Sequence, residues 1–118
     1  MTSTGLKPVA SASTAPEHLS KRSRALWDEV ERGYVLEATE RELLRLGLEA
    51  LDRCAQARET LDREGLVLEN WYHRHVAHPC VAIERDSRIA AVRIFRELGL
   101  ENAPDLDRSP VALARRRR

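Results

Sequence analysis

The chain has 118 residues, of which 42% are hydrophobic, 33% charged and only 4% aromatic. Its length fits one small domain, and the abundance of Leu, Ala, Arg and Glu favours amphipathic helices over a β-sandwich. The formal net charge of only +1 excludes an overall basic protein, so affinity for DNA has to come from the placement of basic groups or from many copies acting together.

Membrane and secreted classes are not indicated. No apolar run is long enough to cross a bilayer, and the first residues lack the apolar region of a signal peptide. The two cysteines, Cys54 and Cys80, have no CxxC spacing, which predicts reduced thiols rather than a disulfide. A soluble cytoplasmic protein is therefore expected.

The first third of the chain predicts a leader and a short helix. Residues 1–18 are rich in Ser, Thr, Ala and Pro, a composition that does not repay the entropy of folding, so a disordered leader is expected. Ser20 is a candidate N-cap, and the apolar residues after it lie on one side of a helix that should end at Gly33.

A long helix is predicted next. Thr39 and Glu42 are spaced as a capping box, in which each side chain bonds the backbone N–H of the other. The helix should run to Glu64 and end at a left-handed Gly65. Its apolar arc spans roughly 200°, about twice what a surface helix needs, so one side should pack within the domain and another against something else. Small residues in the arc, such as Gly47, should let another helix approach closely.

A second long helix should begin with Pro79 at its first position and stop at Gly99. Its expected inner stripe consists of Ile83, Ser87, Ala90, Ala91, Ile94 and Leu98. Apolar residues outside the stripe, repeated on two helices, predict a homo-oligomer, and a monomer in which the first helix covers the excess is the alternative. The candidate interface residues are Leu44, Leu48, Leu51, Val81, Ile89 and Val92.

Between the long helices, LVLENWYHRHVA (residues 66–77) predicts a small β-hairpin, which would need support from the helices or from a neighbour. Residues 101–118 are loop-like and end in four arginines, which predicts a flexible basic C-terminal tail. The expected fold is mainly α: a short N-terminal helix and two long antiparallel helices linked by a hairpin, within a domain of residues 19–100, between disordered N- and C-terminal tails.

His73, His75, His78 and Cys80 would supply up to four zinc ligands. Their spacing matches no zinc finger, and Pro79 starts a helix that should turn Cys80 toward the core. Exposed hairpin histidines and a helix N-cap are the favoured interpretation, so no metal and no other cofactor is expected. The chain also lacks GxSxG and a Gly-rich phosphate loop, and no catalytic residue is predicted. An enzyme is not expected.

Clusters of basic residues are the candidate DNA contacts. Positive charge at the start of the first helix opposes the helix dipole, which phosphate contact or chance placement on a solvated face would explain. The arginines of the last helix would line a positive surface, although ion pairs with Glu84, Asp86 and Glu97 are slightly favoured. The C-terminal arginines suit phosphate contact or solubility. The candidate DNA-binding residues are Lys21, Arg22, Arg24, Arg85, Arg88, Arg115, Arg116, Arg117 and Arg118.

The order of these features resembles a known family. The segment PEHLSKRSRALWDEV, the capped long helix, the turn REGLVLE and the final AHPCVAIERDSRIAAVRIFRELGL are together similar to small subunits of phage terminases. The relatives in question belong to tailed phages and prophages whose genomes also carry a packaging-associated HNH nuclease. The resemblance covers residues 16–100.

This resemblance implies a non-enzymatic DNA-packaging protein in the cytoplasm of a bacterial host. It implies a homo-oligomeric ring that binds double-stranded viral DNA and presents it to the large terminase subunit, the ATPase and nuclease, with an HNH endonuclease as a further partner and no membrane. A small oligomeric transcriptional regulator is the alternative function. A helix-turn-helix with a turn of three or four residues would favour the regulator, and the sequence does not indicate one.

Overall fold

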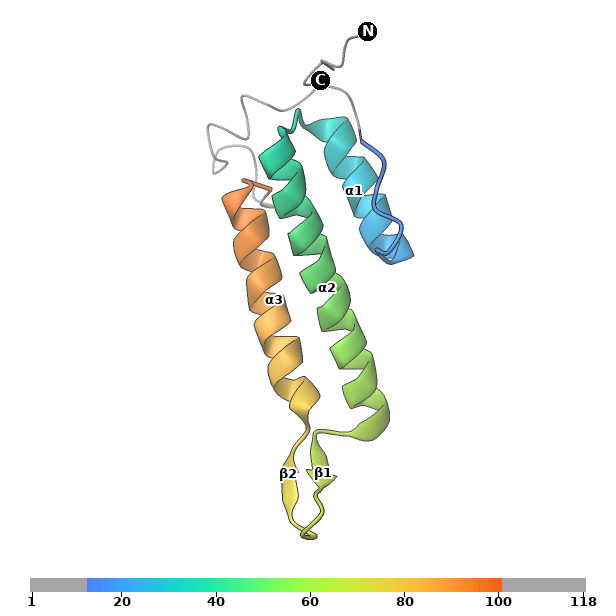
Figure 1. Cartoon of the computed structure of the whole chain (residues 1–118), viewed down its shortest axis with the longest axis vertical. Coiled ribbons are helices and arrows are strands. Elements are labelled where there is room, and N and C mark those ends of the chain that lie inside the picture. Colours follow the sequence, from blue (N-terminus) through green and yellow to red (C-terminus); the bar gives the residue numbers. More distant parts are fainter. Residues whose placement is uncertain (1–12, 101–118) are drawn as a thin grey trace, which may run out of the picture.

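The computed structural model describes residues 13–100, so predictions for the remainder of both tails lie outside it. The helix α2 lies between α1 and α3, and a hairpin joins the far ends of α2 and α3 (Figure 1). The mainly α fold, with two long antiparallel helices linked by a hairpin, is thus confirmed. The elements are α1 (Lys21–Gly33), α2 (Ala38–Glu64), β1 (Val67–Glu69), β2 (His75–Ala77) and α3 (Pro79–Glu97).

Three of the predicted helix boundaries have the expected chemistry. The Ser20 hydroxyl caps α1 by accepting from the backbone N–H of Ser23 at 3.1 Å. Gly65 ends α2 with a φ of +86°, which favours glycine because a Cβ atom would be strained there. Pro79 is the first residue of α3.

Two details of the boundaries differ from expectation. The predicted capping box at Thr39 and Glu42 is wrong, because α2 begins at Ala38 and the Glu40 carboxylate accepts from the backbone N–H of Glu37 at 2.8 Å. Gly33 ends α1 without a left-handed conformation. The chain leaves the helix at Tyr34, which is extended with a φ of −138°.

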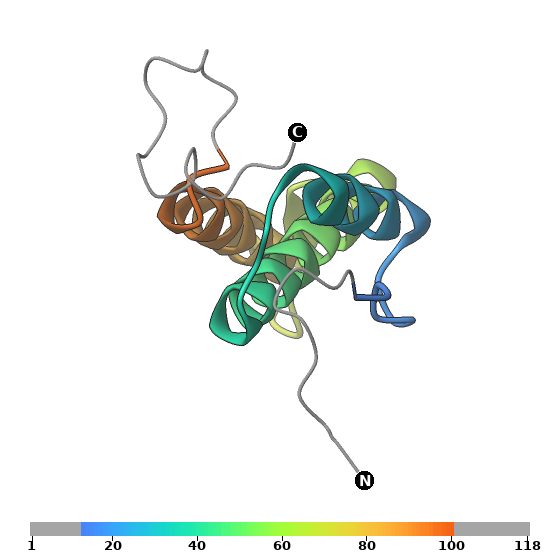
Figure 2. The same ribbon diagram turned by 90° about the horizontal axis from the view of Figure 1, so that it is seen from above.

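The link between α1 and α2 has only four residues, 34–37. Helix-turn-helix proteins have turns of this length. The expectation that no two helices are joined by a turn of three or four residues is therefore wrong. However, α2 lies between two helices, as the view along the bundle shows (Figure 2). A recognition helix has to present its side chains to the major groove, so this position does not favour the regulator.

The main core lies at the end of the molecule where all three helices meet. Within it, Leu44 and Leu48 of α2 are only 0% and 1% exposed. They therefore belong to the interior of the protomer. Whether α1 or a second copy covers this side of α2 could not be decided from the sequence, and the structure shows that α1 does. The buried residues of this core are Leu19, Trp27, Leu36, Leu44, Leu48 and Leu98.

The buried face of α3 is rotated from the predicted stripe. Ser87, Ala91 and Leu98 are buried as expected, but Ile83 and Ala90 are exposed. Phe95, which the stripe omitted, packs against the core. The physical reason is that α3 meets α2 closely on the side of the Phe95 ring.

This close approach occurs at Gly47. A Cβ atom at that position would lie 2.8 Å from Cε1 of Phe95 and 3.0 Å from Cγ2 of Ile94. Such distances are below normal packing contact, so only glycine leaves room for the two side chains as they stand. The small residue in the apolar arc of α2 therefore has the predicted role of admitting another helix.

Replacing Gly47 with valine is expected to lower the free energy of unfolding by about 2 kcal/mol, because Phe95 and Ile94 have to move. Chemical denaturation followed by circular dichroism measures this loss. Gly33→Ala is the matched control, since a Cβ atom there meets nothing within 4 Å and alanine favours helix. An unchanged stability of Gly47→Val would contradict the close contact.

The hairpin extends beyond the helices rather than leaning on them (Figure 1). Its strands are antiparallel, with Leu68 opposite Val76 and Glu69 opposite His75. The predicted hairpin is confirmed, but the expected support comes only at its base. There, the backbone N–H of His78 donates to the carbonyl of Leu66 at 2.8 Å.

Candidate nucleic-acid and protein interfaces

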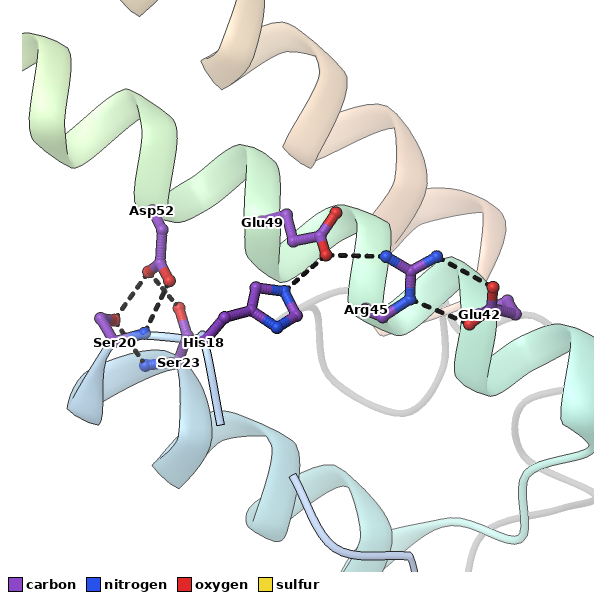
Figure 3. A network of polar contacts seen from close by, with 7 residues as sticks. All are labelled: His18, Ser20, Ser23, Glu42, Arg45, Glu49 and Asp52. Atoms are coloured by element: carbon purple, nitrogen blue, oxygen red, sulfur yellow. Dashed lines mark hydrogen bonds and ion pairs between the residues drawn. The ribbon is translucent and has the colours of Figure 1, made fainter. Parts of the chain in front are cut away.

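The start of α1 is fastened to the middle of α2 by the Asp52 carboxylate (Figure 3). One carboxylate oxygen accepts from the backbone N–H of Ser20 at 2.7 Å. The other accepts from the hydroxyls of Ser20 at 2.7 Å and Ser23 at 2.5 Å. Burial raises the pKa of Asp52, but these hydrogen bonds outweigh it and hold the pKa below its ordinary value. The end of α1 is therefore fixed in position by a charged acceptor.

A second polar chain runs alongside the first (Figure 3). Glu49 is hydrogen-bonded to His18 Nε2 at 2.6 Å and forms an ion pair with Arg45 at 2.7 Å, and Arg45 also pairs with Glu42 at 2.9 Å. Burial raises the pKa of Glu49, yet the hydrogen bonds from His18 and Arg45 lower it overall. The contact through His18 holds the chain before α1 against α2.

Residues 13–18, assigned to the leader from composition, thus have specific contacts. In addition to the His18 pair, the indole N–H of Trp27 donates to the carbonyl of Ser13 at 2.8 Å. Ala15 packs against the core. These contacts hold the segment against α1 and the core.

Three basic side chains surround the fastened end of α1. Lys21, Arg22 and Arg24 are all exposed. Within residues 13–100, no ion pair involves any of the three. Arg22 has a Coulombic interaction with Asp52, but side chains without a close ion pair can contact phosphates without first breaking one.

The arginines of α3 have a different environment. Arg88 pairs with Glu84 at 3.5 Å, and Arg85 lies 3.2 Å from Asp86. These are the ion pairs that the sequence offered as the alternative to DNA contact. Both arginines are exposed, and exposed pairs of this kind are weak enough to rearrange.

Of the other predicted interface residues, Leu51 and Val81 are half-buried, while Ile89 and Val92 are each 50% exposed. Of the six predicted interface residues, only Ile89 and Val92 are therefore substantially exposed. The predicted DNA contacts Arg115 to Arg118 lie outside the described residues.

Two histidines near the hairpin, His73 and His78, have carboxylate partners. His78 Nδ1 accepts from the backbone N–H of Cys80 at 3.0 Å, so neutral His78 carries its proton on Nε2, which lies 2.9 Å from Glu64. The hydrogen bond from His78, then that from Arg63, lowers the pKa of Glu64. His73 Nδ1 lies 3.1 Å from Glu69. Among residues 13–100, no group of three or more His, Cys, Asp or Glu side chains is placed to hold a metal ion.

Sequence reasoning missed three residues of these surfaces. Asp52 bonds partners about 30 positions away, and no local pattern signals such a contact. Trp71 and Tyr72 were assigned to the hairpin, but nothing in their spacing showed that they would be 89% and 76% exposed. The available signal was Asn70, a residue that favours tight turns and so predicts a tip at which neighbouring side chains face solvent.

Three comparisons with known proteins bear on this chain. The family model described as "Phage terminase, small subunit" matches residues 21–108, well over half of the 118 residues. No curated protein and no solved structure matches the chain. Separately, none of the helices within residues 13–100 is long and apolar enough to cross a membrane.

Proposed function

Because the chain belongs to the phage terminase small-subunit family, we propose that it packages phage DNA as a non-catalytic subunit that binds double-stranded DNA and forms a homo-oligomeric ring. The family match over residues 21–108 carries this proposal. The ring presents DNA to the large terminase subunit in the cytoplasm of the bacterial host. An HNH endonuclease is a further proposed partner, and no described surface is assigned to either enzyme.

The first part of the DNA-contact surface in this proposal is the start of α1. Lys21, Arg22 and Arg24 are exposed there, and the Asp52 carboxylate fixes the helix end by three hydrogen bonds. Fixed cations lose little conformational freedom on meeting a phosphate backbone. Repetition of this trio around an oligomer raises the local density of positive charge, which compensates for the low net charge of the chain.

Arg85 and Arg88 are secondary contacts in this proposal, because each has an acidic neighbour that competes with phosphate. The tail residues Arg115 to Arg118 add contacts that are independent of DNA sequence. The interface between protomers includes Ile89 and Val92, whereas the buried Leu44 and Leu48 are left out of it.

Substitution of Lys21, Arg22 and Arg24 with glutamine is expected to weaken binding of a labelled duplex. It should also reduce the slope of log affinity against log salt by roughly 0.9 for each lost phosphate contact. Fluorescence anisotropy over a salt series measures both quantities. The matched control replaces Arg53, Arg58 and Arg63 with glutamine, which removes the same charge from α2. An unchanged slope for the α1 variant, or equal slopes for both variants, would refute the α1 contact.

A further inference from the structure

The tip of the hairpin displays two aromatic side chains on a rigid turn. Asn70 Oδ1 accepts from the backbone N–H groups of Tyr72 and Arg74, each at 2.9 Å. Backbone bonds of 2.8 Å and 2.9 Å also join Asn70 to Arg74 and His73, and His73 has a φ of +62°. Trp71 and Tyr72 are therefore held on a defined backbone, although they contribute almost nothing to the core.

The rest of the hairpin end is apolar as well. Leu66, Val67 and Val76 are exposed, so half of the large exposed hydrophobic side chains of the described residues lie between positions 66 and 76. Arg74 is the only basic residue other than histidine in this range, and Glu69 opposes it in charge. Such a surface fits a protein partner better than DNA, because a nucleic-acid arm needs several cations. Exposed tryptophan and tyrosine are also the residues most enriched among binding hot spots.

A second apolar surface lies on the outer side of α3. Ile89 and Val92 form its centre, and Arg88, Arg93, Arg96 and Glu97 surround it. An aliphatic patch within a rim of guanidinium groups suits an aromatic side chain, which can bury its ring edge and receive a cation on its face. The side chains that line this α3 surface include no aromatic residue, so two copies of the surface cannot supply this contact to each other.

We propose that the hairpin tip of one copy, through Trp71 and Tyr72, docks on the outer surface of α3 of a second copy around Ile89 and Val92. The two surfaces differ in chemistry. They are also separated within one chain, because the tip of the hairpin extends beyond the ends of α2 and α3 (Figure 1). A contact between unlike surfaces is head-to-tail, and repetition of such a contact gives a closed ring or an open filament. This inference rests on the proposed oligomer and names the contact that builds it.

Two double variants test the contact, and neither alters a residue of the protomer core. Trp71→Ala/Tyr72→Ala removes the tip, and Ile89→Gln/Val92→Gln removes the α3 surface. Each variant alone should raise the dissociation constant for assembly roughly tenfold or more, with the melting temperature of the dilute monomer unchanged. Native mass spectrometry and sedimentation velocity measure the species. Leu43→Ala/Leu46→Ala is the matched control, because it removes exposed apolar side chains of α2 and should leave assembly intact.

Mixing the two variants provides the sharper test. Head-to-tail docking leaves each mixed pair with one intact tip and one intact α3 surface, so a one-to-one heterodimer should form and not grow further. No heterodimer, or dimers of each variant with itself, would overturn the proposal while leaving an oligomer possible through other surfaces. Unchanged assembly with weakened duplex binding by the tip variant would overturn it in favour of a DNA-contacting tip. A wild-type protein that stays monomeric at all concentrations would refute both this contact and the proposed oligomer.

Discussion

Replacing Arg41 with methionine is expected to lower the free energy of unfolding by about 2–3 kcal/mol. Arg41 joins the start of α2 to the end of α1 by donating to both carboxylate oxygens of Glu31, at 2.7 Å and 3.2 Å. The hydrogen bond with Glu31 raises the pKa of Arg41. Glu31 is 2% exposed, so the substitution would leave a carboxylate buried without its cation. The expected loss is below that of a fully buried pair because water reaches the guanidinium.

Thermal and urea unfolding of the variant measure this loss. Arg45→Met is the matched control on the same helix, since Arg45 pairs with Glu42 and Glu49 near solvent and should matter much less. Replacing both partners, as Glu31→Leu/Arg41→Met, should recover part of the stability because no charge is then left unpaired. If the single and double variants lose the same stability, the pair does not act through an unpaired carboxylate.

Replacing Asp52 with alanine is expected to cost about 2–3 kcal/mol. The substitution removes the acceptor for the Ser20 backbone, the Ser20 hydroxyl and the fully buried Ser23 hydroxyl. It should also weaken duplex binding, because the end of α1 that carries the basic trio is no longer fixed. Asp62→Ala is the control, since Asp62 is exposed and its ion pair with Arg58 is long, at 3.8 Å.

The Asp52 contact also predicts a dependence on pH. The pKa of this carboxyl is lower in the folded protein than its ordinary value, so its contribution is present above the unfolded pKa and is lost as pH falls through the folded pKa. Wild-type stability should therefore decrease below about pH 4. Denaturation midpoints between pH 6 and pH 3 should show a smaller decrease for Asp52→Ala. An equal decrease in both proteins would assign the acid sensitivity to Glu49 and the other carboxyls with lowered pKa.

A helix boundary could be predicted from the sequence where the backbone conformation at that position favours one residue type. Gly65 is an example, because its positive φ turns the chain out of the helix and so ends α2. The capping box was predicted at Thr39 and Glu42 but lies at Glu37 and Glu40, because Glu40 and Glu42 are both suitable acids and the fold of the connector decides between them. Boundaries that depend on local chemistry were thus predictable to within two residues.

The identity of what covers each apolar face was not predictable in the same way. Periodicity places Leu44 and Leu48 on one flank of the apolar arc that contains Gly47, but it does not say that α1 covers that flank. The same limit applies to Asp52, whose partners Ser20 and Ser23 are about 30 positions away and become neighbours only when α1 packs. The charges of α1 were sufficient to predict the candidate DNA surface, whereas the hydrogen bonds of Asp52 that hold this helix in place are seen only in the structure.

The core at one end has a mechanical consequence for the whole protomer. Its large buried side chains come from α1, the first half of α2, the C-terminal end of α3 and the adjoining Leu19 and Leu36, while the other half of the α2–α3 pair is closed mainly by Ala57, Leu61 and Ser87. Resistance to local opening therefore decreases from the α1 end toward the hairpin. The better-packed end carries the proposed DNA contacts, and the end that opens more readily carries the hairpin. We therefore expect the proposed contacts through the hairpin to tolerate more variation in angle than the proposed DNA contacts of α1.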